Sequence, residues 1–279
     1  MSRTLIVYIC FAIRIASADD GGSMPTDGER FLAAIARGDL ASVRQTAGSI
    51  RIEQVPNLLS HALSSPNPDV VAYLRQSHDL GISDLQIAAI RGDTGRIRQL
   101  LGQLDGKAKR TALAQGYASP ISSQSPLSLA VRNGHADAVR ELISADAEVN
   151  EYCHYTLTPL ANAAELGHTE IVRLLLNHGA VVDMAPDSYT ALMRACVGGK
   201  FDSAKILLDA GANPNAVRQD GQRPLHFAAK AGSVECVNLL LARGESSCSC
   251  ILKRHGPEIR REQYNHQAIV KVLQDAVDK

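Results

Sequence analysis

The sequence predicts an all-α solenoid, in which helix–turn–helix units stack in a line. Four short Pro-Leu or Ala-Leu blocks recur with their first residues 33, 32 and 33 positions apart. Each block is followed by small residues and then by a run rich in Leu, Ile and Val at helical spacing. A constant period of this length is typical of repeat architectures whose neighbouring units share one continuous core. The blocks begin at Pro126, Pro159, Ala191 and Pro224.

Each block favours the start of an inner helix. Ser125, Thr158 and Thr190 precede three of the blocks, and a hydroxyl there can accept a hydrogen bond from a first-turn N–H. Pro is tolerated at the first helical position. The Leu, Ile and Val run then gives an outer helix with an apolar stripe, on which we expect Leu174 to be buried. The glycines that follow the outer helices suit a left-handed cap: Gly179, Gly211 and Gly244.

This pattern resembles the ankyrin repeat family. The best matches are Thr158–Asp183 and Arg223–Arg243, and residues 211–215 (Gly-Ala-Asn-Pro-Asn) close a unit in family order. The resemblance implies an ankyrin-repeat solenoid of stacked helix–turn–helix units with short loop fingers. Ser125 and Arg223 stand where the family has Thr, and Ala191 where it has Pro, so we expect capping bonds to be lost at these units.

The repeat register predicts four segments of different regularity. Phe31–Gln45 and Leu58–Leu74 match the repeat loosely, and Lys107–Leu113 is an extra segment that we interpret as an additional helix. The predicted segments are a signal peptide at 1–18, degenerate repeats at 19–124 with an insertion near 102–124, regular repeats at 125–244 and a C-terminal capping repeat at 245–279.

The N-terminus has the three parts of a secretory signal peptide. A basic start precedes the apolar run Thr4–Ile13, and residues 16–18 (Ala-Ser-Ala) form a small-x-small cleavage site before Asp19. At about ten residues, the apolar run is too short to span a bilayer, which needs roughly 20. We therefore expect a periplasmic or secreted protein without a membrane span. The alternative is a cytoplasmic protein translated from Met24.

Composition and motifs argue against catalysis and nucleic-acid binding. The 29 basic and 29 acidic residues cancel, which does not support bulk binding of nucleic acid. No nucleophile elbow, zinc-protease motif or complete phosphate loop is present, so we predict no enzyme activity, no catalytic residue and no cofactor. Residues 198–200 (Gly-Gly-Lys) occupy a repeat turn, and His135 is expected to hydrogen-bond neighbouring backbone there.

The cysteines do not predict a metal site. Cys196 and Cys236 fall at small or apolar positions of the repeat and are expected to be buried. A second group invites a zinc interpretation, but its gaps of one and ten residues differ from the usual ligand spacings. We predict no metal and keep this zinc site as the alternative: Cys248, Cys250, His255 and His266.

The resemblance also implies where a partner binds, because ankyrin arrays bind proteins through loop tips and inner helices. We expect one unidentified protein partner and a monomeric chain. Aromatic and apolar residues at such positions are suited to an interface hot spot. The implied partner-binding residues are Tyr152, His154, Tyr155, Glu165, Leu166, Met184, Val197, Val217, Arg218 and Lys230.

The expected function is therefore a non-catalytic protein–protein interaction module, acting in the cell envelope. The chain is similar in this respect to exported, bacterial-type ankyrin proteins, some of which are linked to stress defence or to toxin neutralisation. The alternative is a secreted effector that binds a host protein.

Overall fold

The computed structural model describes residues 27–48, 65–78, 83–114, 125–151, 157–185, 188–244, 269 and 271–275. These residues form α-helices and no β-strand, which confirms the predicted fold class. The described residues fall into two compact units, one within residues 3–148 and the other within residues 149–279. Among the described residues, no helix is long and apolar enough to cross a membrane.

The first unit contains the irregular repeats and the first of the regular ones, formed by α9 and α10. Its first core is small: Phe31 and Ile35 pack with Val43 and Leu74, and all four side chains are fully buried. The loosely matching segment Phe31–Gln45 therefore folds as a helix pair, as the sequence predicts. The helices of this unit are α2 (Asp27–Arg37), α3 (Leu40–Ala47), α5 (Pro68–His78), α6 (Asp84–Arg91), α7 (Thr94–Gly102), α8 (Gly106–Leu113), α9 (Pro126–Arg132) and α10 (Ala136–Ser144).

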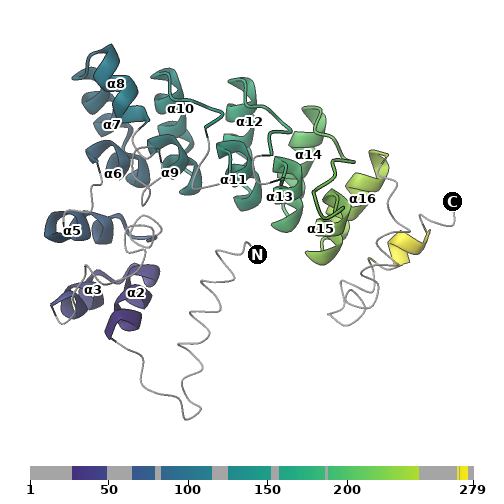
Figure 1. Cartoon of the computed structure of the whole chain (residues 1–279), viewed down its shortest axis with the longest axis horizontal. Helices are drawn as coiled ribbons and strands as arrows, with labels where there is room; N and C mark the ends of the chain where they lie inside the picture. Colours follow the sequence, from purple (N-terminus) through teal and green to yellow (C-terminus); the bar gives the residue numbers. More distant parts are fainter. Residues whose placement is uncertain are drawn as a thin grey trace, which may run out of the picture. The chain divides into compact units, whose positions relative to one another are not determined.

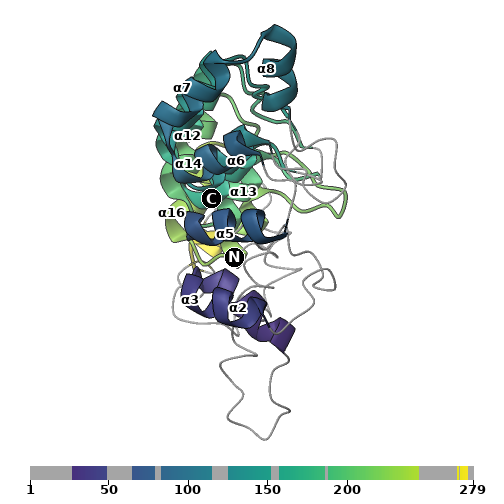
Figure 2. The same ribbon diagram turned by 90° about the vertical axis from the view of Figure 1, so that its left-hand side faces the viewer.

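Helix α8 is the additional helix that the sequence predicts, and Figure 1 and Figure 2 show it next to α7. Asp105 starts it by accepting hydrogen bonds from the N–H groups of Lys107 and Ala108, at 3.0 and 2.7 Å. Leu113 is its one buried residue, so the helix adds little to the core of the unit.

The position of His135, in the turn between α9 and α10, supports a structural role for this side chain. Nε2 of His135 lies 2.8 Å from the carbonyl oxygen of Ile90, in the last turn of α6 of the preceding repeat. The ring therefore links two neighbouring repeats through the backbone, as predicted, and no catalytic role is needed to explain its position.

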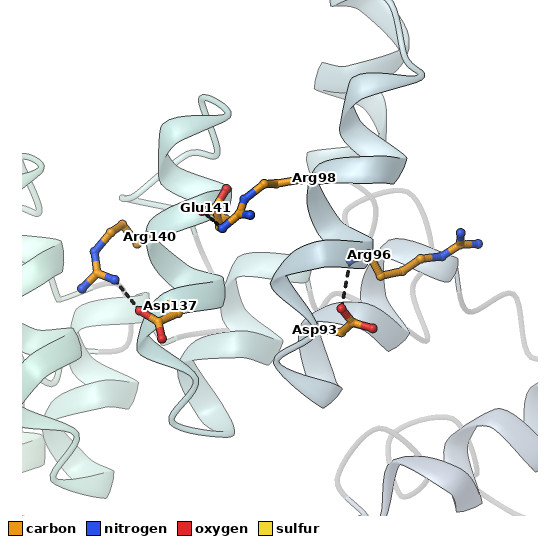
Figure 3. A network of polar contacts seen from close by, with 6 residues as sticks. All are labelled: Asp93, Arg96, Arg98, Asp137, Arg140 and Glu141. Atoms are coloured by element: carbon orange, nitrogen blue, oxygen red, sulfur yellow. Dashed lines mark hydrogen bonds and ion pairs between the residues drawn. The ribbon is translucent and has the colours of Figure 1, made fainter.

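An ion pair between outer helices of this unit joins two successive repeats. Arg98 reaches from α7 to Glu141 on α10, where Nη2 donates a hydrogen bond to Oε1 at 2.8 Å (Figure 3). The neighbouring Asp137–Arg140 pair stays within α10. The hydrogen bond from Arg98 lowers the pKa of the Glu141 carboxyl below its ordinary value, and partial burial opposes this effect.

We expect Arg98→Ala to raise the pKa of Glu141 toward its ordinary value, which an NMR titration of the carboxyl carbon would measure. Because the folded-state pKa is lowered, the pair stabilises the unit at neutral pH, and this contribution is lost as pH falls through the folded-state pKa. Because the two side chains are 65% and 28% exposed, solvent screening keeps this contribution small. An unchanged titration in Arg98→Ala would show that the hydrogen bond does not form in solution.

The second unit contains the regular repeats, in which inner and outer helices alternate. The inner helices α11, α13 and α15 pack in sequence, as do the outer helices α12, α14 and α16, and Figure 1 shows these two rows. Their bounds are α11 (Pro159–Leu166), α12 (Thr169–Asn177), α13 (Ala191–Val197), α14 (Phe201–Asp209), α15 (Pro224–Lys230) and α16 (Val234–Ala242).

The helix caps differ in part from the expectation. Thr158 and Thr190 accept hydrogen bonds from first-turn N–H groups, at 3.1 and 3.2 Å. The expected loss at the Ala191 unit was therefore wrong, because the cap depends on the Thr190 hydroxyl and not on Pro at the next position. Ser125 keeps its bond at 3.0 Å, so the expected loss at this residue was wrong: a Ser hydroxyl caps as Thr does. At Arg223, which has no hydroxyl, the backbone N–H instead donates to Nδ1 of His226 at 3.2 Å.

The outer helix α12 places its buried stripe one residue later than expected. Ile171, Val172 and Leu175 are buried, whereas Leu174 is half-buried. The buried positions follow the spacing i, i+1 and i+4, and Leu174 lies at the edge of that stripe. The glycines after the outer helices have the predicted left-handed conformation, with φ of 85° at Gly179 and 91° at Gly211.

Little of the C-terminal segment is described. Residues 269 and 271–275 are helical, and Ile269 and Leu273 are fully buried. This agrees with a helix at that point of the repeat register. The limits of the capping repeat, like those of the other predicted segments, stay a prediction.

Candidate partner-binding face

The predicted binding residues fall partly outside the described residues. Tyr152, His154 and Tyr155 belong to residues 152–156, which the structure does not describe, so the loop-tip prediction there stays a prediction. The other seven residues all lie in the 149–279 unit, on inner helices or on the loops that precede them.

Two apolar residues of the predicted set are well exposed. Val217, in the loop before α15, is 60% exposed, and Leu166, the last residue of α11, is 40% exposed. Met184 and Val197 are half-buried, whereas the Lys230 side chain at the end of α15 is exposed. The four apolar residues of the set therefore present some apolar surface to solvent: Leu166, Met184, Val197 and Val217.

Glu165 does not match the expectation of an exposed inner-helix position. Its side chain is 8% exposed, and Oε2 lies 3.5 Å from Nη1 of Arg194 on the next inner helix. A Cβ atom on Gly198 would stand 2.3 Å from the Glu165 carbonyl oxygen, so α13 approaches α11 very closely here. This approach buries Glu165, which therefore holds Arg194 in place and presents little surface of its own.

The structure brings Tyr189 into the same region, although the sequence pattern did not single it out. The guanidinium carbons of Arg194 and Arg218 each lie 4.2 Å from the centre of the Tyr189 ring. The Phe227 ring lies 5.3 Å away in a tilted arrangement. We call Arg194, Tyr189 and Arg218 the arginine–tyrosine stack.

The residue directly before Tyr189 has an unusual backbone conformation. Ser188 has a φ of 66°, a left-handed conformation that is uncommon for residues other than glycine. Its N–H donates a hydrogen bond to the carbonyl oxygen of Ala185 at 3.0 Å. Strained backbone of this kind often accompanies functional sites. The sequence signal for this site was an aromatic residue directly before the Thr-Ala-Leu block.

No metal-binding cluster is found in the described part of the chain. It contains no cluster of three His, Cys, Asp or Glu residues that could hold a metal ion. Cys196 and Cys236 are fully buried, as predicted, and burial raises the pKa of the Cys236 thiol. The alternative zinc residues Cys248, Cys250, His255 and His266 lie outside the described residues.

The glycine-rich segment at 198–200 forms a repeat turn. Gly199 has a φ of 62°, and the Lys200 N–H returns to the carbonyl oxygen of Ala195 at 2.8 Å. Lys200 then starts α14. This geometry explains the segment without a bound phosphate.

A family model for ankyrin repeats in three copies matches residues 85–185, 127–218 and 181–254. The chain belongs to the ankyrin repeat family. Ankyrin repeats mediate protein–protein interactions and are generally non-enzymatic, which agrees with the predicted function class.

Several curated proteins contain similar ankyrin repeats. Human ankyrin repeat and SOCS box protein 10 is 51% identical over 87 residues, which cover 31% of this chain and 19% of that protein. Platypus ankyrin repeat, SAM and basic leucine zipper domain-containing protein 1 is 32% identical over 120 residues, or 41% and 25% of the two chains. Human transient receptor potential cation channel subfamily A member 1 is 32% identical over 122 residues, or 43% and 11%.

These alignments cover at most a quarter of each of the three relatives. All three are animal proteins, so they do not support the bacterial-type assignment made from the sequence. The repeat itself is therefore what the chain shares with them.

Proposed function

We propose that this chain is a non-catalytic interaction protein, whose 149–279 unit binds one partner protein through the inner helices and the loops before them. The observation that carries the proposal is the exposed apolar surface at Val217 and Leu166, 60% and 40% exposed. The core of these repeats is formed by other residues, among them the buried Leu160, Leu192 and Leu225. The fold therefore does not require apolar residues at positions 166 and 217.

The face also has the rigidity that an interface favours. The arginine–tyrosine stack joins residues of two loops and α13, and Glu165 of α11 supports Arg194. A preorganised surface loses less conformational entropy when a partner binds. Tyr and Arg are also among the residues enriched in interface hot spots.

We expect Leu166→Asp combined with Val217→Asp to weaken binding of a purified partner at least tenfold, because each change places a charge in an apolar contact. Isothermal titration calorimetry would measure the dissociation constant. The circular dichroism spectrum should stay unchanged, since both side chains lie outside the core.

Asn238→Asp is the control, because Asn238 is exposed on the outer helix α16 and gains one negative charge, as each position of the double variant does. Binding should be unaffected by this change. If Asn238→Asp weakened binding and the double variant did not, the partner would bind the outer helices and the proposed face would be wrong.

We also propose that the chain is exported to the cell envelope after cleavage between Ala18 and Asp19. The support is the order of the sequence features: the apolar run Thr4–Ile13, the residues Ala-Ser-Ala at 16–18 and an acidic segment. Intact-mass measurement of the protein from its native source should give a chain that starts at Asp19. A chain that retains residues 1–18 or starts at Met24 would contradict export.

The remaining functional expectations stay predictions. The effector role, the stress-defence role and the monomeric state concern properties on which the described residues do not bear.

A further inference from the structure

The turn after α9 contains the only asparagine of the sequence that is followed directly by glycine, Asn133-Gly134. Such a pair is prone to spontaneous deamidation, because glycine has no Cβ atom to hinder the reaction. The backbone nitrogen of the glycine attacks Cγ of the asparagine, ammonia leaves, and a five-membered succinimide ring forms. Water then opens the ring at either carbonyl and leaves aspartate or isoaspartate. The reaction consumes one water, releases one ammonia and needs no enzyme.

The folded turn holds the two reacting groups apart. Asn133 has a ψ of 0°, which eclipses the Gly134 nitrogen with the Asn133 nitrogen and turns it away from the side chain. Ring closure needs that nitrogen on the side of Cβ, in a near-attack geometry. Both groups are also hydrogen-bonded. Nδ2 of Asn133 donates to the carbonyl oxygen of Leu129 at 2.8 Å, and the Gly134 N–H donates to that of Val131 at 3.1 Å. The ring can therefore close only after the turn opens.

Aspartate does not fit this turn. It replaces the Nδ2 donor with an oxygen, which would face the carbonyl oxygen of Leu129 with no hydrogen between them. It also adds a negative charge at the C-terminal end of α9, where the helix dipole disfavours it.

Isoaspartate disturbs the turn through the main chain, because it inserts a methylene group into the backbone directly before Gly134. His135 follows at once. Its N–H donates to the carbonyl oxygen of Ala130 at 3.0 Å, and its Nε2 lies 2.8 Å from the carbonyl oxygen of Ile90 in the preceding repeat. A longer backbone at this point displaces His135 from both partners.

We propose that Asn133 is a spontaneous deamidation site whose reaction is controlled by opening of the α9–α10 repeat, and that either product weakens the link to the preceding repeat. Repeats of a solenoid open locally and are stabilised mainly by their neighbours. Modified chains therefore arise from chains whose repeat has opened, and they do not recover full stability. The site lies within residues 3–148 and is independent of the proposed binding face.

The test incubates the full chain at mildly alkaline pH, either folded or unfolded in urea, and follows every asparagine-containing peptide by mass spectrometry. In urea, Asn133 should deamidate faster than any other asparagine. In the folded chain the same reaction should be at least tenfold slower, because the opened turn is a minor population. Faster reaction of another asparagine in urea would refute the site, and equal rates in the two states would refute control by opening.

Leu127→Ala should speed the reaction in the folded chain, because Leu127 is buried on α9 and its truncation favours opening of this repeat. Leu192→Ala is the matched control, since Leu192 is buried at the same position of α13 in the other unit and should affect Asn133 much less. Hydrogen exchange of the Gly134 amide in the unchanged protein reports the same opening, whether or not Leu127→Ala folds. Equal acceleration by both variants, or a deamidation rate that does not follow this exchange as temperature rises, would overturn control by local opening.

Chains modified at Asn133 should be separated by chromatography and compared with unmodified chains in thermal unfolding. Both product forms should unfold at a lower temperature. Asn133→Asp should reproduce the aspartate form, whereas Asn177→Asp places the same charge at the exposed C-terminal end of α12 and should destabilise less. Unfolding of the modified chains at the temperature of the unmodified chains would contradict the proposed loss of the link between repeats.

Discussion

Leu175→Ala is expected to lower the free energy of unfolding of the 149–279 unit by about 2–5 kcal/mol, the usual cost of a buried Leu truncation. The Leu175 side chain is fully buried, with 0% exposure, and it lies on α12, which packs against both α11 and α14. Removing its side chain leaves a cavity between three helices. Urea denaturation followed by circular dichroism would measure the loss.

The neighbouring Leu174→Ala is the natural control, because Leu174 is only half-buried and should cost clearly less. Hydrogen exchange adds a second readout. Leu175→Ala should weaken protection within the regular repeats, whereas Leu74→Ala should weaken protection of residues 27–78, whose small core contains Leu74. Equal and simultaneous loss of protection over both regions in both variants would contradict nearest-neighbour stabilisation.

Gly198→Ala is expected to destabilise the same unit by about 1–3 kcal/mol, as overpacked sites do. The new Cβ atom would stand 2.3 Å from the carbonyl oxygen of Glu165, and this contact is with backbone, which cannot rotate away. Helices α11 and α13 must therefore separate slightly, which would also disturb the Glu165–Arg194 pair. Thermal unfolding would measure the effect.

Gly102→Ala provides the comparison, because the same methyl group would meet no atom within 4 Å at the end of α7. That change should be neutral or stabilise by up to about 1 kcal/mol, since Ala restricts the unfolded chain more than Gly does. If both substitutions had the same effect, the close approach of α11 and α13 would not exist in solution.

The repeat period was enough to predict most of the fold. The helix starts at Thr158 and Thr190, the left-handed glycines and the extra helix α8 depend on local sequence, so a single chain reveals them. The position of Leu174 was predicted less well, because a run of three leucines leaves the exact buried face open to a shift of one residue.

The binding face was harder to predict, because it depends on contacts between repeats. Glu165 and Arg194 are 29 residues apart in the sequence, and their contact becomes apparent only when successive inner helices are seen packed together. The stack on Tyr189 similarly needs Arg218 from the next loop. Repeat position alone gives the side of the solenoid on which a residue lies, but not its neighbours across the repeat boundary.

Site-specific photo-crosslinking tests the central claim most directly. A photoreactive amino acid would be placed either at position 217, in the loop before α15, or at position 238, on the outer helix α16. Both positions are exposed, so neither substitution should affect folding. We predict that the partner crosslinks at position 217 and not at position 238. A crosslink at position 238 with none at position 217 would contradict binding through the inner helices and their loops.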